Sequence, residues 1–433
     1  MDAGEIVDLE ITGVAHGGVF VARHEGRVVF VPDAIVGERV RARLTDTRKS
    51  SFWRAETLEV LDASPDRRAH VWAAADIDVA PERRAGGADF GHIALPRQRE
   101  LKLDVFRDAL QRIGKFDDLA VTMQEPSPGS DVDGTPAAES SDGTGWRTRV
   151  SLHVDDAGTV GPFAARSHTV IPVDDLPLAT AAVERAAAAL HGGAAGRIDL
   201  VQPADGRVRV IARPDSAGRT PPAAETVIER VGDREFRVDA GGFWQVHRLA
   251  AHTLTQLVTE ELRAAGVPID ADASHLDLYG GVGLFAATLA ELGGPATRVT
   301  SIESDPRATE HAGENLAEWV GARAETARVD RYVARLAAEA SDRERERLSR
   351  GVVLLDPPRA GAGREVVEKI AALAPNAVVY VACDPVALAR DLRTFADLGY
   401  AARRGIRAVD LFPNSHHVEA VTVLERDPDT MTA

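Results

Sequence analysis

The stretch Leu276-Asp277-Leu278-Tyr279-Gly280-Gly281-Val282-Gly283 decides the fold of this 433-residue chain. An apolar strand runs into a glycine-rich turn, and the pattern of residues 284–292 predicts a helix directly after it. Glycine lets the backbone turn tightly and approach a ligand closely, and the free amides at the start of the helix can receive an anionic group. We therefore expect a ligand site at this turn.

The same order of strand and helix repeats from residue 241 to residue 433. Such alternation predicts a parallel sheet with helices on both faces. The sequence thus indicates the α/β class, with a doubly wound, Rossmann-like domain over residues 241–433. The further elements that we expect are strand 298–303, helix 306–320, strand 352–355, helix 364–373, strand 377–382, helix 385–398 and strand 418–424.

Two kinds of ligand fit the glycine turn. Gly281, Gly283 and Ala286 satisfy the pattern G-x-G-x-x-A, which favours a nicotinamide dinucleotide. Glu303 ends the next strand, where a carboxylate can accept hydrogen bonds from ribose hydroxyls. S-adenosylmethionine sites of class I methyltransferases use a similar turn and the same acidic position, so the turn alone leaves both ligands open.

The sequence Asp356-Pro357-Pro358-Arg359 delivers a carboxylate to the carboxyl edge of the sheet, where open α/β folds bind their ligands. The prolines stiffen this turn because they fix φ and lack an amide donor. Asp/Asn-Pro-Pro followed by an aromatic residue is typical of amino-group methyltransferases. Here the fourth residue is arginine, which disfavours methylation of an exocyclic amine.

Cys383, the only cysteine, follows the next strand and should emerge on the same edge as Asp356. Asp384 suits the N-cap and Pro385 the first position of the following helix, whose positive end can lower a thiol pKa. A single cysteine excludes internal disulfides and any cluster held by several cysteines. A buried core cysteine is the alternative interpretation.

The segment His416-His417-Val418-Glu419 brings two histidines and a carboxylate together near the C-terminus. Neighbouring strand residues point to opposite faces, so the two histidines cannot easily share an ion, and we expect no metal site. Glu419 is either an ordinary edge charge or a functional group.

Residues 1–62 alternate short β-branched stretches with glycine turns, which predicts a small closed β-barrel. Residues 63–240 are less regular and predict a mixed α+β central region for substrate recognition, with a helix at 96–113. Within it, residues 121–145 hold five acidic side chains and no basic one, so we expect a disordered acidic loop there.

The net charge of −16 weakens the case for a nucleic-acid partner without removing it, because basic side chains gather elsewhere, as in Arg83-Arg84 and Arg403-Arg404. No stretch of about 20 apolar residues could span a membrane, and the N-terminus lacks the pattern of a secretory leader. We expect a cytoplasmic protein.

Taken together, the motifs of residues 241–433 resemble the RNA uracil-C5 methyltransferases, which form 5-methyluridine in rRNA or tRNA. In front of them, Gly13-Val14-Ala15-His16-Gly17-Gly18 and the strands around it resemble the TRAM domain, a small OB-like barrel of RNA-modifying enzymes. The matching segments are Phe243-Trp244-Gln245-Val246, the turn 277–283, Glu303-Ser304-Asp305, Asn315, residues 356–361, residues 383–385 with 388–392, Phe412-Pro413 and residues 416–419.

The resemblance implies a role for each of these residues. Cys383 would be the nucleophile towards C6 of uracil, Glu419 the base that removes the C5 proton, and Asp356 a group that orients the uracil or the thiol, beside the cofactor. The residues that would hold S-adenosylmethionine are Gln245, Tyr279, Gly281, Gly283, Glu303 and Asp330, together with Asp356. RNA would be the partner of a monomeric enzyme, with the target base flipped out of its stack.

The chain departs from the family pattern in three places. Ala85 and Ala88 stand where many relatives have cysteines of a [4Fe–4S] cluster, so we expect no cluster. Gly280 and Leu284 replace a Cys and an Asn that are frequent in the glycine turn, and one cofactor contact could therefore differ. His247 replaces a common Asn.

Two other classes of function stay open at this level. An NAD-dependent oxidoreductase rests only on the glycine pattern and leaves Cys383, Asp356 and Glu419 unexplained. An RNA-binding protein without catalysis would not need Cys383 and Glu419 intact.

Overall fold

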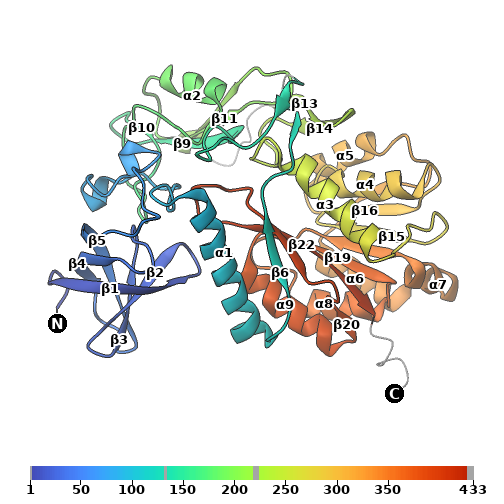
Figure 1. Cartoon of the computed structure of the whole chain (residues 1–433). Coiled ribbons are helices and arrows are strands. Elements are labelled where there is room, and N and C mark those ends of the chain that lie inside the picture. The colour runs from blue at the N-terminus through green and yellow to red at the C-terminus, as the bar shows by residue number, and fades with distance from the viewer. Residues whose placement is uncertain (1, 131–133, 218–223, 427–433) are drawn as a thin grey trace.

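A computed structural model describes residues 2–130, 134–217 and 224–426. A small barrel lies at one end of the molecule and a large sheet with its helices at the other (Figure 1). A layer made from the middle of the sequence lies above both.

The N-terminal residues form the predicted closed barrel, with strand order β1-β2-β3-β5-β4. Alternate residues of β1 are buried, because one face of each strand points into the barrel. Leu9, Phe20 and Val29 fill its core. The strands are β1 (Ile6–Ala15), β2 (Val19–His24), β3 (Arg27–Val31), β4 (Arg39–Asp46) and β5 (Phe52–Asp62).

A nine-stranded sheet carries the C-terminal half, in the order β17-β16-β15-β18-β19-β22-β21-β6 with β20 paired to β22. Strands β15 to β19 run parallel to one another, and β22 runs antiparallel to β19 and β21. The strands are β6 (Val121–Gln124), β15 (His275–Leu278), β16 (Val299–Glu303), β17 (Arg323–Thr326), β18 (Val352–Leu355), β19 (Ala377–Ala382), β20 (Tyr400–Ala401), β21 (Ile406–Val409) and β22 (Glu419–Arg426). Of these, β6, β17, β20 and β21 had not been predicted.

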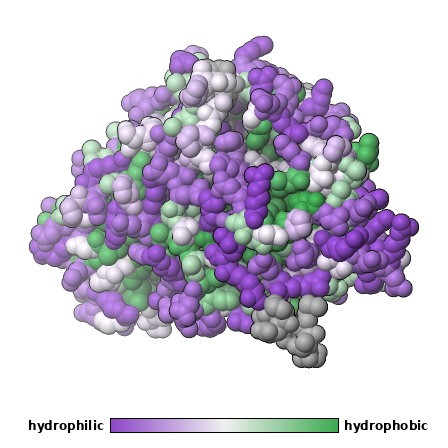
Figure 2. All heavy atoms as spheres, turned by 45° about the vertical axis from the view of Figure 1, so that its right-hand side comes forward, coloured by the Kyte–Doolittle hydropathy of each residue, from purple (hydrophilic) through white to green (hydrophobic). Residues whose placement is uncertain are grey.

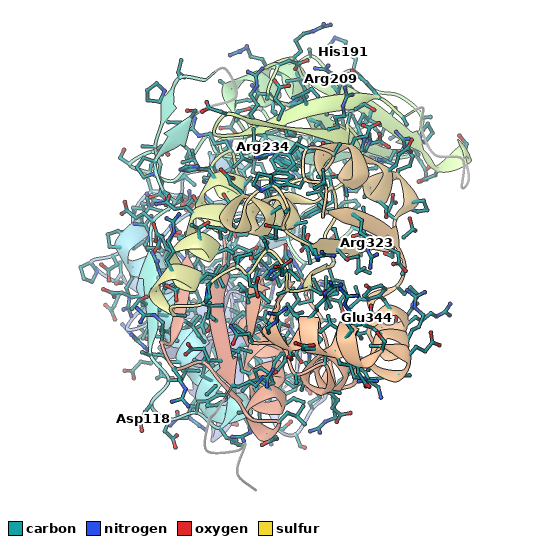
Figure 3. All side chains as sticks on the ribbon, turned by 90° about the vertical axis from the view of Figure 1, so that its right-hand side faces the viewer. Asp118, His191, Arg209, Arg234, Arg323 and Glu344 are labelled. Carbon is teal, nitrogen blue, oxygen red and sulfur yellow. The ribbon has the colours of Figure 1, made fainter. Side chains whose placement is uncertain are left out.

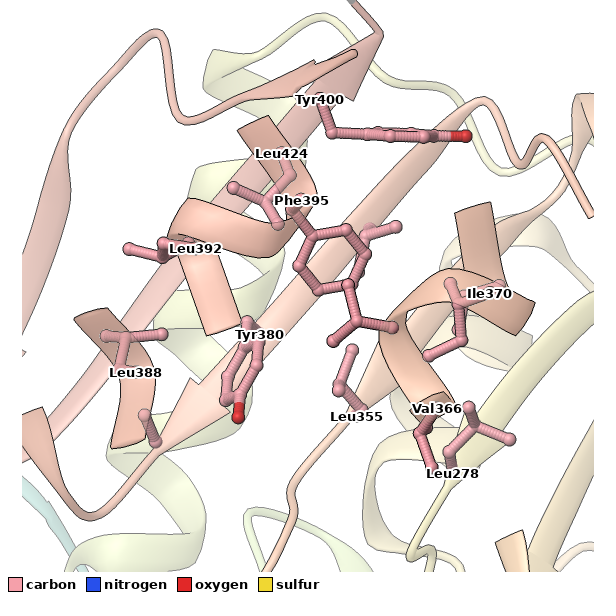
Figure 4. Packing of buried hydrophobic residues seen from close by; sticks show 14 of the residues in the cluster. Leu278, Leu355, Val366, Ile370, Tyr380, Leu388, Leu392, Phe395, Tyr400 and Leu424 are labelled. Carbon is pink, nitrogen blue, oxygen red and sulfur yellow. The ribbon is translucent and has the colours of Figure 1, made fainter. Parts of the chain in front are cut away.

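Helices cover both faces of this sheet, as the doubly wound prediction requires. On one face, Val352 and Leu354 of β18 pack with residues of α3 and α4. On the other face, Val353 and Leu355 pack with residues of α6, α8 and α9. Figure 4 shows part of this second cluster, including Leu355, Ile370 of α8 and Phe395 of α9. The helices are α1 (Leu95–Ala109, continued by a π-turn at Leu110–Gly114), α3 (Ala250–Ala264), α4 (Leu284–Gly293), α5 (Pro306–Asn315), α6 (Val329–Glu339), α7 (Asp342–Arg350), α8 (Arg364–Ala372) and α9 (Pro385–Asp397).

The predicted central region does not form one separate unit. Helix α1 buries Phe106 and Leu110 in the core of the large sheet, and β6 extends that sheet as the neighbour of β21. Residues 121–145 were predicted to be disordered, which is wrong for β6, because the apolar Val121 pairs with Ile406. Downstream of β6, Glu125 forms an ion pair with Arg99. Residues 131–133 of the predicted loop lie outside the described residues.

The remaining central residues form small antiparallel layers. One sheet has the order β10-β9-β11-β12, and the hairpin β13-β14 packs against α5. The elements are β7 (Gly129–Ser130), β8 (Pro136–Ala137), β9 (Arg149–Val154), β10 (Val160–Gly161), α2 (Ala181–Ala188), β11 (Gly196–Val201), β12 (Arg209–Pro214), β13 (Thr226–Val231) and β14 (Arg234–Asp239), with 3-10 turns at Ala73–Ala75, Pro81–Arg83 and Asp215–Ala217.

The face drawn in Figure 2 is mostly hydrophilic, with smaller hydrophobic patches between the hydrophilic areas. Among the described residues, no helix has both the length and the apolar character needed to cross a membrane.

Candidate active site

The predicted glycine turn joins β15 to α4 at the carboxyl edge of the sheet. Tyr279, Gly281 and Gly283 all have positive φ angles, of 63°, 53° and 89°. A Cβ on Gly280 would stand 2.0 Å from the hydroxyl of Ser301, so a larger residue there would require the side chain of Ser301 to move. The turn therefore lies close to β16 and leaves room above Gly281, where an added Cβ would meet nothing within 4 Å.

Two carboxylates hold this turn. Asp277 is fully buried beneath it and accepts hydrogen bonds from the amide of Ala286 (3.0 Å) and the hydroxyl of Ser301 (3.2 Å). Burial raises the pKa of Asp277 to about 7. Glu303 accepts from the amides of Gly281 (3.2 Å) and Asp305 (2.8 Å) at the end of β16.

Tyr279 and Asp330 border the same end of the sheet. Burial, followed by the negative charge of Asp330, raises the pKa of Tyr279 to about 12. Asp330 lies in the first turn of α6, where it pairs with Arg328 at 2.8 Å. Gln245 is partly exposed and makes no side-chain hydrogen bond within the described part of the chain, so nothing ties it to this group.

These residues suit S-adenosylmethionine. The ribose of that cofactor needs a carboxylate acceptor, which Glu303 offers at the usual place. The bare turn at Gly281 allows close approach of a ligand, and Oδ1 of Asp277 is buried without a partner among the described residues. A polar ligand beside the turn is consistent with all three observations.

Cys383, Glu419 and Asp356 meet at one edge of the sheet, as their sequence positions predicted. The antiparallel pairing of β19 with β22 ends at Ala382 opposite Ala420, so the next step sets Cys383 opposite Glu419. Side chains directly opposite in such a pair stand about 5 Å apart. Asp356 follows the end of β18, the other neighbour of β19, and its charge acts on both groups.

The ionisation of these three groups is strongly shifted. Burial raises the pKa of the Cys383 thiol to about 12, and the charges of Glu419 and Asp356 add to this. Burial also raises the pKa of Asp356 to about 7 and that of Glu419 well above its usual value. The sequence had shown only that the helix start after Cys383 can lower a thiol pKa. In the structure the pKa is raised, because burial and nearby carboxylates oppose the thiolate, and Asp384 caps α9 by accepting from Ala387 (2.8 Å).

A pocket opens above Cys383, and the barrel forms one of its walls. Its lining includes the barrel turn at residues 15–18, together with Arg359, Cys383 and His416. Nε2 of His16 lies 3.2 Å from Oδ2 of Asp384. Gly18 touches His416 so closely that an added Cβ would stand 2.8 Å from the Cβ of that histidine.

The two histidines before Glu419 have separate partners. Nδ1 of His416 lies 2.7 Å from Oδ2 of Asp89. Burial lowers the pKa of His417 to about 3, so its neutral ring accepts a hydrogen bond from Arg359 (3.3 Å). No group of three or more metal-binding side chains occurs among the residues that the structure describes.

Sequence reasoning had assigned no role to two side chains of the surrounding region, Arg147 and Phe243. The guanidinium of Arg147 lies 4.8 Å from the ring centre of Trp146 and makes no hydrogen bond with any described residue. Burial lowers the pKa of Arg147, with Asp89 opposing this effect and Arg359 adding to it. Phe243, beside Gln245, is 74% exposed, which is unusual for a phenylalanine.

The departures from the family pattern have structural counterparts. Ala85 and Ala88 are buried in an apolar cluster with Trp72 and Trp146. Beside them, the buried Arg84 donates to Asp33 of the barrel (2.8 Å) and to three backbone carbonyls, tying this segment to the barrel. His247 is buried and stacks on Trp146, and its pKa falls to about 3, so it acts as a neutral packing residue.

The fold and the site define a class I S-adenosylmethionine-dependent methyltransferase with an N-terminal barrel. The family model described as TRAM domain matches residues 2–56, and the one described as tRNA (Uracil-5-)-methyltransferase matches residues 263–427. An uncharacterized RNA methyltransferase of Streptomyces avermitilis is 37% identical, with 98% of each chain covered. The chain belongs to the RNA uracil-C5 methyltransferase family.

One further relative and one solved structure of similar fold carry more specific names. The 23S rRNA (uracil(1939)-C(5))-methyltransferase RlmD of Halomonas elongata is 29% identical, with 98% of this chain and 90% of that protein covered. The crystal structure of the Pyrococcus abyssi tRNA (uracil-54, C5)-methyltransferase in complex with S-adenosyl-L-homocysteine superimposes with a TM-score of 0.65, at 20% identity, over 96% of this chain and 99% of that one. This likeness confirms the predicted fold class.

Proposed function

We propose that the protein transfers a methyl group from S-adenosylmethionine to C5 of a uridine in rRNA or tRNA, as a cytoplasmic monomer, through a covalent bond between Cys383 and C6 of the base. The observation that carries this proposal is the strand register that sets Cys383 opposite Glu419, with Asp356 at the same edge. A nucleophile and a base are both needed at one uracil ring, because C5 is unreactive until C6 is attacked.

The chemistry assigns one role to each side chain. The sulfur of Cys383 bonds to C6, and the electron pair of the C5–C6 double bond becomes an enolate that takes the methyl group at C5. Glu419 then removes the C5 proton, the double bond re-forms, and the C6–S bond breaks. The cofactor supplies the methyl group on a positive sulfonium, a charge that favours the ionised forms of nearby acids.

The shifted pKa values indicate how the thiol is activated. A thiol with a pKa of about 12 is almost fully protonated at neutral pH and needs a base. Asp356, with a pKa of about 7, is half ionised there, and its charge reaches Cys383. We assign Asp356 the acceptance of the thiol proton when the uracil is attacked.

The pocket above Cys383 implies that the target base enters alone. Its walls come from the barrel turn and from the loop of His416, so a stacked base could not reach the thiol. Arg147 and Arg359 offer guanidinium donors for the phosphate or carbonyl oxygens of the flipped nucleotide. The exposed ring of Phe243 offers a stacking surface for a neighbouring base.

The function is tested by mapping 5-methyluridine in total RNA from cells with and without the gene. We expect the signal to disappear at one or a few uridines of rRNA or tRNA and to return when the purified enzyme and S-adenosylmethionine are added. An unchanged map, together with no methyl transfer to RNA from the deleted strain, would contradict the proposal.

The alternative of an NAD-dependent oxidoreductase is excluded by the family to which the chain belongs.

Replacing Glu303 by alanine should weaken cofactor binding. Hydrogen bonds to a charged group contribute about 1.5–3 kcal/mol, so we expect the Kd for S-adenosylhomocysteine to rise roughly 10- to 100-fold in titration calorimetry. Glu325→Ala, at the end of the neighbouring strand β17, is the control and should leave this Kd unchanged, because Glu325 pairs with Arg335 instead. Equal affinities of the Glu303 and Glu325 variants would exclude Glu303 from the cofactor site.

Replacing His16 by alanine should impair use of RNA without affecting cofactor binding. His16 joins the barrel to Asp384, next to the nucleophile, and this contact raises the pKa of His16. We expect kcat/KM for RNA to fall about 5- to 20-fold, which corresponds to roughly 1–2 kcal/mol for one charge-assisted hydrogen bond. His16→Gln, which keeps a neutral donor, should recover part of the loss; identical values for wild type and His16→Ala would remove His16 from the positioning of this site.

A further inference from the structure

A second hollow lies at the amino edge of the large sheet, opposite the active site. Arg298, which precedes β16, and Arg323, which begins β17, line one side of it. Arg343 and Arg347 of α7 line the other side, and Glu344 is the one carboxylate of the described lining. Figure 3 shows Arg323 and Glu344 on the face that looks away from the barrel.

The arginines of this hollow differ from the others nearby in having no acidic partners. Arg298, Arg343 and Arg347 make no side-chain hydrogen bond or ion pair within the described part of the chain. The partners of Arg323 are the hydroxyl groups of Thr300 (3.0 Å) and Tyr332, and neither is a carboxylate. Neighbouring arginines do find carboxylates: the pairs are Arg328–Asp330, Arg335–Glu325 and Arg350–Asp270. Acidic residues are in excess over the whole chain, 67 against 51 basic ones, so scarcity of carboxylates does not explain the difference.

We propose that this hollow binds a phosphoryl group, carried either by the RNA backbone or by a free phosphorylated small molecule. Four guanidinium groups against one carboxylate leave about three uncompensated positive charges around one depression, an arrangement that repels itself unless an anion enters. The planar donor fork of arginine matches phosphate oxygens, usually through two hydrogen bonds at once. The serine and threonine hydroxyls of the lining are further donors for such a group.

The hollow is separate from the methyl-transfer site. Its residues stand where strands β16 and β17 begin, whereas Glu303 and the glycine turn stand where strands end. Strands of four to five residues separate the two edges by about 15 Å. The bound phosphoryl group is therefore neither the cofactor nor the target nucleotide.

The test compares Arg343→Gln/Arg347→Gln with Arg350→Gln, a control on the same helix outside the hollow. Each full-length protein is titrated with substrate RNA at several salt concentrations and, separately, with inorganic pyrophosphate. If RNA is the source, the double variant binds RNA about 5- to 20-fold more weakly, and the slope of log K against log salt falls by between one and two. If a small molecule is the source, the double variant binds RNA as well as the wild type does. It binds pyrophosphate at least about tenfold more weakly than the wild type.

The proposal would be overturned if the double variant and the control had the same RNA affinity, the same salt slope and the same pyrophosphate affinity. The affinity for S-adenosylhomocysteine is expected to stay at the wild-type value in both variants, which reports that the fold is intact. Because the test measures binding and no methyl transfer, its outcome is independent of the proposed catalytic mechanism.

Discussion

Cys383→Ala is expected to abolish methyl transfer to RNA, with a loss of at least about 10⁴-fold in kcat, because no other described side chain can form the bond to C6. The measurement is transfer of label from methyl-labelled S-adenosylmethionine to RNA. Cys383 is the only cysteine in the chain, so no second thiol can substitute for it. Binding of S-adenosylhomocysteine should persist in the variant, which separates loss of chemistry from loss of structure.

RNA that contains 5-fluorouridine sharpens this experiment. Fluorine at C5 blocks removal of a proton there, so the wild-type enzyme with cofactor should remain attached to the RNA through Cys383 after denaturation. The rate of attachment should rise with pH up to about 7 and then level off, because Asp356 accepts the thiol proton only when it is ionised. Methylation by Cys383→Ala at the wild-type rate would show that the covalent mechanism is wrong.

The arrangement of the proposed catalytic residues could be predicted because it depends on strand ends. Parallel strands finish at one edge of a sheet, so motifs placed directly after strands, such as Asp356 and Cys383, must converge there. Glu419 faces Cys383 because β22 returns antiparallel beside β19. The positions of the motifs after the strands, and the rule that parallel strands end at one edge of a sheet, were therefore sufficient to predict this part of the site.

Features that depend on contacts distant in sequence were not predicted. Strand β6 joins the large sheet next to β21, almost three hundred residues later, and nothing in its short, acidic surroundings signals that partner. The contact of His16 with Asp384 depends on how the barrel docks. The raised pKa of Cys383 depends on burial and on two carboxylates from other strands, whereas the sequence displayed only the helix start beside it.

Glu419→Gln is expected to trap the reaction half-way on ordinary RNA. The bond from Cys383 to C6 and the methyl group at C5 should both form, but the C5 proton stays in place, and the enzyme therefore cannot release its product. We expect turnover to fall at least about 10³-fold while a covalent complex that carries the labelled methyl group accumulates, visible as a slowly migrating band after denaturing electrophoresis.

Glutamine is a close substitute at this position, because Glu419 is buried and its pKa is raised well above the usual value, so the site favours a neutral side chain of this size. The variant should therefore fold normally, with a Tm near that of the wild type. Glu425→Gln, further along β22, is the matched control and should turn over normally without a trapped complex. Adding Cys383→Ala to Glu419→Gln must remove the trapped band, since the complex needs the thiol. Normal turnover of Glu419→Gln would instead mean that another group removes the proton, and Asp356, a second carboxyl group of raised pKa whose charge reaches Cys383, would then be the first to test.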